Sequence, residues 1–393
     1  MTLTDTTHLP PPETRDLRIG YMRLTDAAPL ILAKESGLFE HYGLNVSLHR
    51  EVSWANMRDR LVVGDLEAAQ MLAPLLLATN LGVSGVSGNL LTGLSLGVNG
   101  NAITLSNRLW ESMDIPPTGA TPDSLITARA LARQIGTGRP RLTFATVHMF
   151  SMHTFLLRIW LQAAGIEADS IRLLVLPPEQ MCDNLARNAI DGFCVGAPWN
   201  TVAIEQGIGT VAATGHQIWP HAPEKVLAVS GQWHNANPST HLRARLAIME
   251  ACRRLTQPEQ RVEIASIMSQ SRYLDLPITF LQPSLTGNFR FSKQHPLTSV
   301  PGFHVFWEHA ATFPWRSHAE WIVRQTSDML GTTLPEDRIE ALVQQCYRTD
   351  LYQEAAGWLK EPVPDQDKRT KNTPASLVLL QTGASDPQSG TGS

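Results

Sequence analysis

Lys225 is the residue of this sequence whose position most clearly suggests chemistry. It stands between a proline-containing turn and a short apolar run, in the stretch P-H-A-P-E-K-V-L-A-V that covers 220–229. The apolar run is typical of a buried strand, so the lysine would begin that strand at the edge of a core. A single positive charge in such a place could bind an anion.

Other residues could contribute to the same kind of site. Trp54, His153 and Gly196 lie in the stretches S-W-A, S-M-H and C-V-G-A-P-W, where a predicted strand gives way to a predicted helix. In parallel α/β sheets, such junctions gather at the carboxyl ends of the strands, where ligands bind. The helix N-termini there present free backbone N–H groups, which suit anions. Trp54 would add one indole donor, and Asn101 would add an amide with two donor hydrogens.

Each of these residues also has an alternative explanation that involves no ligand. A tryptophan at a helix start is more often a packing residue, and a lone lysine such as Lys225 is more often solvated. His148 with His153, and His216 with His221, lack the i, i+4 spacing and the acidic or thiol neighbours of a metal site. We also find no P-loop and no nucleophile elbow in the sequence. The residues alone therefore predict a small-ligand binder that favours an anion.

The composition indicates a globular protein with a large core. The chain has 393 residues, of which 43% are hydrophobic and 17% are charged, with a formal net charge of -4. This length predicts two domains or two lobes, and the charge gives no reason to expect nucleic acid or an anionic membrane as a direct partner. The N-terminal stretch lacks the pattern of a secretory signal, and no apolar run is long enough to span a membrane. The four cysteines lack C-x-x-C spacing, which favours reduced, buried thiols.

Strand and helix patterns alternate twice along the chain. The first set includes the strand L-R-I-G-Y-M, with Asp26 as the expected N-cap of the following helix, and the second set begins with R-L-T-F-A-T. Strands that alternate with helices favour a largely parallel sheet in each lobe, with the two lobes facing each other across a cleft. We predict this organisation: a flexible leader at 1–16, the first part of lobe 1 at 17–106, lobe 2 at 107–222, a return to lobe 1 with C-terminal helices at 223–360, and a flexible tail at 361–393.

Several motifs together resemble a known family. They are L-T-D-A-A-P-L-I-L-A-K-E-S-G-L-F-E-H-Y-G-L-N-V, S-W-A-N-M-R-D-R-L-V-V-G, N-G-N-A-I-T-L-S, P-P-E-Q-M, D-G-F-C-V-G-A-P-W-N and H-A-P-E-K. In this order, over about residues 17–350, the chain resembles the nitrate-binding receptors of ABC transporters and their cytoplasmic relatives, the NasS-type nitrate/nitrite sensors. The resemblance implies the type II periplasmic-binding-protein fold, in which two α/β lobes surround a central ligand cleft.

The resemblance also implies a ligand and a set of binding residues. The family's nitrate contacts fall on Trp54, Asn101, His153, Gly196 and Lys225 of this sequence. The receptors have glutamine where this chain has Asn101, so the amide is one methylene shorter here. The histidine assignment depends on the alignment of M-H-T-F-L-L-R-I-W, and His148 is the alternative. The bicarbonate receptors that resemble the family have an acid at the lysine position, so Lys225 favours nitrate or nitrite over bicarbonate.

A choice among three classes of protein follows. The N-terminal sequence favours a cytoplasmic sensor, which by resemblance would hold an antiterminator response regulator with an RNA-binding ANTAR domain (NasT-type) inactive until the anion binds. We expect no enzymatic activity, no cofactor, no direct nucleic-acid contact and no membrane contact. The alternatives are a nitrate-binding solute receptor of an ABC transporter and, less favoured, an enzyme similar to the pyrimidine synthases of thiamine biosynthesis.

Overall fold

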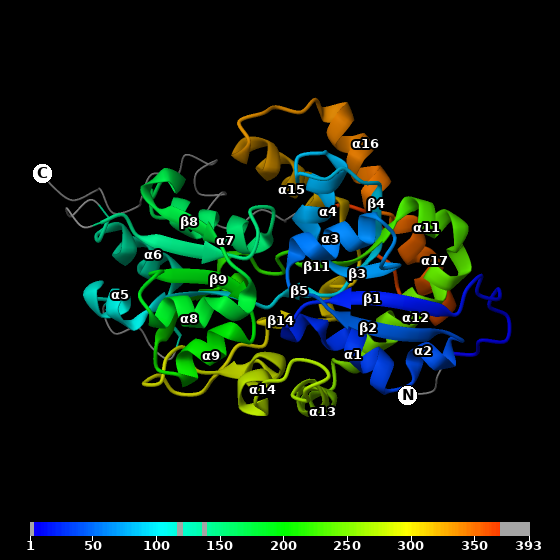
Figure 1. Cartoon of the computed structure of the whole chain (residues 1–393), viewed down its shortest axis with the longest axis horizontal. Helices are drawn as coiled ribbons and strands as arrows, with labels where there is room; N and C mark the ends of the chain where they lie inside the picture. The colour runs from blue at the N-terminus through cyan, green and yellow to red at the C-terminus, as the bar shows by residue number, and fades with distance from the viewer. Residues whose placement is uncertain (1–3, 116–120, 136–139, 370–393) are drawn as a thin grey trace, which may run out of the picture.

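The structure is a computed structural model in which residues 4–115, 121–135 and 140–369 are described. Two five-stranded sheets organise these residues, and in Figure 1 the two sheets lie on opposite sides of the view. We call the parts built around them lobe 1 and lobe 2. The predicted α/β fold with two lobes is therefore confirmed.

The sheet of lobe 1 has the strand order β2-β1-β3-β11-β4. β1 pairs in parallel with β2 and β3, whereas β11 runs antiparallel to both of its neighbours. These strands are β1 (Asp16–Tyr21), β2 (Asn45–Arg50), β3 (Ala68–Leu72), β4 (Leu90–Ser95) and β11 (Lys225–Ser230).

The sheet of lobe 2 has the strand order β10-β6-β9-β7-β8. β7 pairs in parallel with β8 and β9, and β6 runs antiparallel to β9 and β10. Its strands are β6 (Asn101–Ser106), β7 (Thr143–Thr146), β8 (Arg172–Val175), β9 (Gly192–Gly196) and β10 (Gly209–Thr214).

In each sheet the reversed strand is the one that arrives from the other lobe. The chain passes from β4 through the short β5 (Val98–Asn99) into β6, and it returns from β10 into β11. The crossing strands β6 and β11 each enter their new sheet from the side that faces the other lobe. They therefore run antiparallel to the strands beside them. The sheets are therefore largely parallel, as the sequence predicts. The predicted boundary at residue 106 is placed too late, because β6 already belongs to lobe 2.

The helices cover both sheets. Those of lobe 1 are α1 (Ala28–Glu35), α2 (Leu38–His41), α3 (Trp54–Val62) and α4 (Ala73–Asn80), and those of lobe 2 are α5 (Asn107–Ser112), α6 (Ser124–Ala132), α7 (Met152–Gln162), α8 (Met181–Ala186), α9 (Trp199–Glu205) and α10 (Gly215–Ile218). After β11 come α11 (Gly231–Ala236), α12 (Pro238–Arg254), α13 (Pro258–Met268), α14 (Ile278–Thr286), α15 (Arg316–Met329), α16 (Glu336–Cys346) and α17 (Thr349–Leu359). None of the helices in the described part of the chain has the length and apolar character needed to cross a membrane.

The C-terminal third of the chain packs on both lobes. The sequence predicts a return of 223–360 to lobe 1, and α12 and α17 do pack there. However, Phe289 and Phe303 lie in an apolar cluster with Val211 of β10, and Trp321 of α15 lies edge-on to Phe155 of α7 with ring centroids 5.7 Å apart. In Figure 1, α13 and α14 lie along the bottom of the view and extend from beneath lobe 1 toward lobe 2. This segment therefore joins the two lobes.

The residues before β1 are held against lobe 1. The sequence predicts a flexible leader at 1–16, but Leu9 is buried and the side chain of Arg243 on α12 binds the chain around it. The Arg243 guanidinium donates hydrogen bonds to the carbonyl oxygens of Pro10 (2.9 Å), Leu9 (3.1 Å) and Tyr42 (2.7 Å). The prediction is therefore wrong for residues 4–15, because one arginine supplies partners for carbonyls from two separate segments.

The predicted flexible tail also begins too early. Asp367 accepts a backbone hydrogen bond from Arg316, and the Arg369 guanidinium lies 4.5 Å from the ring centroid of Trp315. Residues 361–369 thus pack against the start of α15. The remainder of the predicted tail, 370–393, lies outside the described residues.

Arg243→Ala should loosen the N-terminal segment around Leu9 and Pro10. The change removes the two hydrogen bonds to these carbonyls and the one to Tyr42, so we expect the free energy of unfolding to fall by about 2 kcal/mol. Chemical denaturation measures this change, and limited proteolysis should show new cleavage within residues 4–15. Arg187→Ala is the matched control, because Arg187 is exposed at the end of α8. Equal protection of the segment in both variants would contradict the account.

Candidate anion-binding site

Lys225 is buried between the two lobes at the start of β11. Its register in the sheet is fixed by pairing with Leu72 of β3, and its side chain is 1% exposed. The ammonium nitrogen lies 2.8 Å from Oδ2 of Asp26 and also contacts the carboxylate of Glu224. It lies 5.5 Å from the ring centroid of Trp54. Burial lowers the pKa of Lys225 from its usual value, and the charge of Asp26 partly offsets this effect.

Asp26 is held in place by a chain of hydrogen bonds. Its Oδ1 accepts from Nε2 of Gln70 (2.6 Å), and Oε1 of Gln70 accepts from the backbone N–H of Met22 (3.0 Å). The sequence predicts Asp26 as the N-cap of the first helix, but the N-cap residue of α1 is Ala27. The prediction is wrong because the carboxylate turns away from the helix and pairs with Lys225 instead.

Trp54 and His153 both stand in the first turn of a helix. Ser53 caps α3 by accepting the N–H of Asn56 (3.1 Å), and Ser151 caps α7 by accepting the N–H of Thr154 (3.1 Å). These two serines fix where the helices begin, and therefore where the two side chains lie. Within the described part of the chain, Nε1 of Trp54 and both ring nitrogens of His153 are buried without a hydrogen-bond partner.

The imidazole of His153 is neutral at ordinary pH. Complete burial lowers its pKa well below the usual value, and the charge of Lys225 lowers it further. A neutral imidazole has one N–H donor and one acceptor nitrogen. The indole N–H of Trp54 and one N–H of the His153 imidazole are thus available to donate hydrogen bonds to an acceptor beside Lys225.

Asn101 and Gly196 approach the same point from lobe 2. They stand opposite each other at the ends of β6 and β9. Asn101 donates from Nδ2 to Oε1 of Glu224 (2.9 Å), while its own Oδ1 is buried and unpaired among the described residues. A side chain at Gly196 would point toward that Oδ1, with a Cβ 3.4 Å from it, so glycine keeps the space in front of the Asn101 amide open.

Glu224 occupies the centre of this arrangement. Its Oε1 accepts from Asn101 and lies 3.9 Å from Nε2 of His153, and its Oε2 faces Lys225. The space left beside it is a cavity of about 10 Å³, lined by Asp26, Leu96, Gly97, Asn99, Glu224, Lys225 and His304. Such a volume holds about one water molecule. The carboxylate of Glu224 thus contacts Asn101 of lobe 2 and Lys225 of lobe 1 at the same time.

The two lobes are in direct contact around the site. Thr25 of lobe 1 donates its N–H to the carbonyl of Ala197 in lobe 2 (2.9 Å). At the surface, Arg23 pairs with Glu179 across the lobes at 3.1 Å, beside a larger cavity of about 110 Å³. The structure thus represents a closed arrangement of the lobes.

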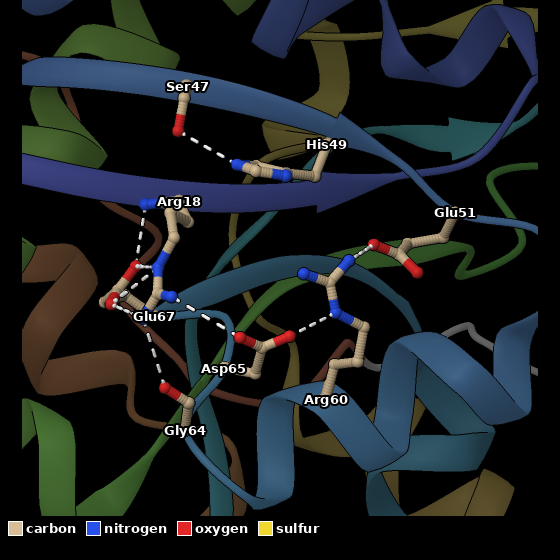
Figure 2. Close-up of polar contacts among 8 residues, drawn as sticks. All are labelled: Arg18, Ser47, His49, Glu51, Arg60, Gly64, Asp65 and Glu67. Atoms are coloured by element: carbon tan, nitrogen blue, oxygen red, sulfur yellow. Dashed lines mark hydrogen bonds and ion pairs between the residues drawn. The ribbon is translucent and has the colours of Figure 1, made fainter.

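A network of charged side chains supports the helix that carries Trp54. Figure 2 shows Arg60 of α3 between Glu51 and Asp65, with Oδ2 of Asp65 2.6 Å from Nε of Arg60. Asp65 also lies 3.4 Å from Arg18 of β1, which in turn pairs with Glu67 at 2.6 Å. The pairs tie the far end of α3 to the sheet of lobe 1. Ser53 fixes the near end, so both ends of the helix are positioned.

The structure brings the five predicted residues together. Lys225 lies against Trp54, Asn101 and His153 meet at Glu224, and Gly196 faces Asn101. The alternative histidine, His148, is used in its own loop, because its Nδ1 accepts the N–H of Phe150 at 3.0 Å. Burial, together with the charge of Arg58, lowers the pKa of His148 to about 4.

The sequence analysis missed two important groups, Asp26 and Glu224. Glu224 is adjacent to Lys225 in the P-E-K stretch, and this adjacency is a signal that could have been used. Residues on consecutive positions of a strand usually point to opposite faces, however, so adjacency argued against a shared site. Glu224 precedes β11 and is free of that alternation, which explains how both side chains reach one point.

Comparisons with known proteins agree with this arrangement. The sequence profile of the NMT1-like family matches residues 10–269. The nitrate/nitrite binding protein NrtA of Synechococcus elongatus is 30% identical over 375 residues, which cover 92% of this chain and 82% of that protein. The nitrate import ATP-binding protein NrtC of Synechocystis is 34% identical over 352 residues, which cover 88% of this chain and 51% of that protein. This chain thus spans about half the length of NrtC.

A solved structure shows the same fold. The crystal structure of the periplasmic nitrate-binding protein NrtA from Synechocystis superimposes with a TM-score of 0.84 at 28% identity, over 93% of this chain and 95% of that one. The chain therefore belongs to the NMT1-like family and, within it, to the group that includes the nitrate/nitrite binding protein NrtA and the bicarbonate-binding protein CmpA, with the type II periplasmic-binding-protein fold.

Proposed function

We propose that this chain is a cytoplasmic sensor that binds nitrate or nitrite at Lys225 and catalyses no reaction. The observation that carries the ligand is one buried ammonium group surrounded by donors without partners. In the part of the chain that is described, Nε1 of Trp54 and both ring nitrogens of His153 have no hydrogen-bond partner. The names of the NrtA relatives point to nitrate and nitrite, whereas CmpA and CmpC are named for bicarbonate, so Lys225 supports the choice of nitrate or nitrite in this proposal.

The chemistry of nitrate fits this set of groups. Nitrate is a planar monoanion with acceptors only, so a buried site needs donors around its edge and one cation to offset the loss of hydration. Trp54, His153 and Asn101 supply N–H donors, and Lys225 supplies the charge. Nitrite has the same charge and the same acceptor chemistry, so both anions are expected ligands.

The position of the donors suggests how binding is transmitted. Trp54 and Lys225 belong to lobe 1, whereas Asn101, His153 and Gly196 belong to lobe 2. An anion that touches both sets is bound more tightly when the lobes are closed, so it shifts the population toward the closed arrangement. If a partner prefers the open arrangement, anion and partner oppose each other's binding by the same factor.

The partner in this proposal is a response regulator with an RNA-binding ANTAR domain. The chain would hold it inactive in the absence of the anion and release it when nitrate or nitrite binds. A second function, that of a nitrate-binding receptor for an ABC transporter, is supported by the superposition on periplasmic NrtA at a TM-score of 0.84. The two proposals share the anion site and differ in the partner and the compartment.

Lys225→Met should abolish nitrate binding. Removal of the Lys225 ammonium leaves the two buried carboxylates of Asp26 and Glu224 without their cation, so we expect affinity to fall by more than about 100-fold. Isothermal titration in a buffer free of competing anions measures this loss, and circular dichroism checks the fold. Lys34→Met on α1 is the control, because Lys34 pairs with Glu40 at the surface. Unchanged affinity in a folded Lys225→Met protein would place the site elsewhere.

Trp54→Phe should weaken nitrate binding by about tenfold, because it removes one N–H donor and keeps an aromatic ring beside Lys225. The same titration measures the change. Trp315→Phe is the matched control, since the Nε1 of Trp315 donates to the carbonyl of Ala310 (3.1 Å) and takes no part in the site. If both substitutions have the same effect on affinity, the indole of Trp54 does not contact the anion.

Nitrate should dissociate the complex with the response regulator. We expect the two purified proteins to co-elute in size-exclusion chromatography without the anion and to separate when sodium nitrate is added. The Lys225→Met protein should keep its partner in nitrate. Nitrate binding by a chain that forms no complex with the regulator would instead favour the transport receptor, and cell fractionation would then locate the protein.

A further inference from the structure

The buried groups at the site carry an unbalanced charge before any ligand arrives. Lys225, Asp26 and Glu224 have side chains that are 1%, 9% and 3% exposed, respectively. With both carboxylates ionised, the three groups sum to one negative charge. A bound nitrate ion would change the net charge of the site from −1 to −2. These charges would be buried, where water cannot screen them.

Glu224 also competes with the anion for its donors. Its Oε1 accepts the Asn101 amide at 2.9 Å and lies 3.9 Å from Nε2 of His153. Its other oxygen contacts the Lys225 ammonium, so the carboxylate lies between the Asn101 amide and the lysine. Nitrate can enter only if the carboxylate of Glu224 moves from the Asn101 amide.

The other titratable groups around Glu224 supply no positive charge. Burial lowers the pKa of His153 on α7 well below its usual value, and burial lowers the pKa of His304 on the short strand β14 (His304–Val305) to about 4. Burial raises the pKa of the Cys194 thiol on β9. All three groups are thus neutral at ordinary pH. Asp26 already pairs with Lys225 and keeps a hydrogen bond from Gln70.

We propose that the monoanion binds together with one proton, which Glu224 takes up, so that Glu224 determines which anions the site accepts. This inference rests on the proposed function, because it concerns the same site. The proton comes from water or buffer and forms an O–H bond on the carboxylate, with no other bond made or broken. Nitrate is the conjugate base of a strong acid, so the protein must hold the proton.

Protonation has two consequences for the site. It removes one negative charge, and the three groups then sum to zero before the anion is counted. It also converts one oxygen of Glu224 into a donor, which can point to the bound anion. Bicarbonate carries its own proton and can donate it to an ionised Glu224, so bicarbonate would bind without proton uptake.

The direction of the pH effect follows from linkage. Because the complex holds one more proton than the free protein and free nitrate, affinity rises as pH falls. The affinity for nitrate should decrease by up to about tenfold for each unit by which the pH rises, over the range in which Glu224 is ionised in the free protein. A site without proton uptake would show constant affinity over that range.

Isothermal titration of the full chain with sodium nitrate tests this proposal. The same titration in two buffers of different ionisation enthalpy gives the number of protons taken up per anion. We expect a value close to one for the native chain and a dissociation constant that rises from about pH 6 to about pH 8. Glu224→Gln should bind nitrate with no proton uptake and with little dependence on pH.

Glu259→Gln is the matched control, because Glu259 is an exposed carboxylate in the first turn of α13. It should take up protons as the native chain does. Nitrate binding by the native chain without proton uptake would overturn this inference alone. Uptake that persists in Glu224→Gln would also overturn it, since the proton would then belong to His153 or Lys225. A complete absence of nitrate binding at every pH would overturn the proposed function as well.

Discussion

The burial of the Lys225 ammonium group is the constraint on which the rest of the site depends. A buried cation is unfavourable unless opposite charges and hydrogen-bond partners surround it. Asp26 lies 2.8 Å from the ammonium and is itself fixed by Gln70. The second carboxylate, Glu224, then makes the site acidic overall. An anion that binds must therefore overcome the net negative charge of these three side chains. Glu224 is thus as important for anion binding as Lys225.

The two crossing strands explain why this charge lies between the lobes. β6 and β11 are the strands that run against their sheets, and they begin with Asn101 and Lys225, respectively. Both residues therefore stand where the chain passes from one lobe to the other. The capped first turns of α3 and α7 bring Trp54 and His153 to the same place. The ligand site thus includes residues of the segments that cross between the lobes. Binding of an anion there is therefore coupled to the relative position of the two lobes.

Much of this arrangement could be predicted from the sequence, for reasons that differ among the residues. The strand and helix periodicity predicted the two lobes, and the S-W-A stretch was predicted as the junction at which α3 begins. Residue types and strand-to-helix junctions pointed to an anion site, and the motifs shared with the family assigned nitrate contacts to the same five residues. The role of Asp26 was missed because a helix-cap pattern is local, whereas its partners Gln70 and Lys225 are distant in sequence. The packed N-terminal segment was missed because partners such as Arg243 and Thr240 lie more than 200 residues away in sequence.

A crystal structure of the full chain grown with nitrate would test the central claim most directly. The account predicts nitrate within hydrogen-bond distance of Lys225 and of the ring nitrogens of Trp54 and His153. It also predicts that the Glu224 carboxylate has moved away from the Asn101 amide. Nitrate bound at another place, or a Glu224 carboxylate that still accepts from Asn101 beside a bound anion, would contradict it.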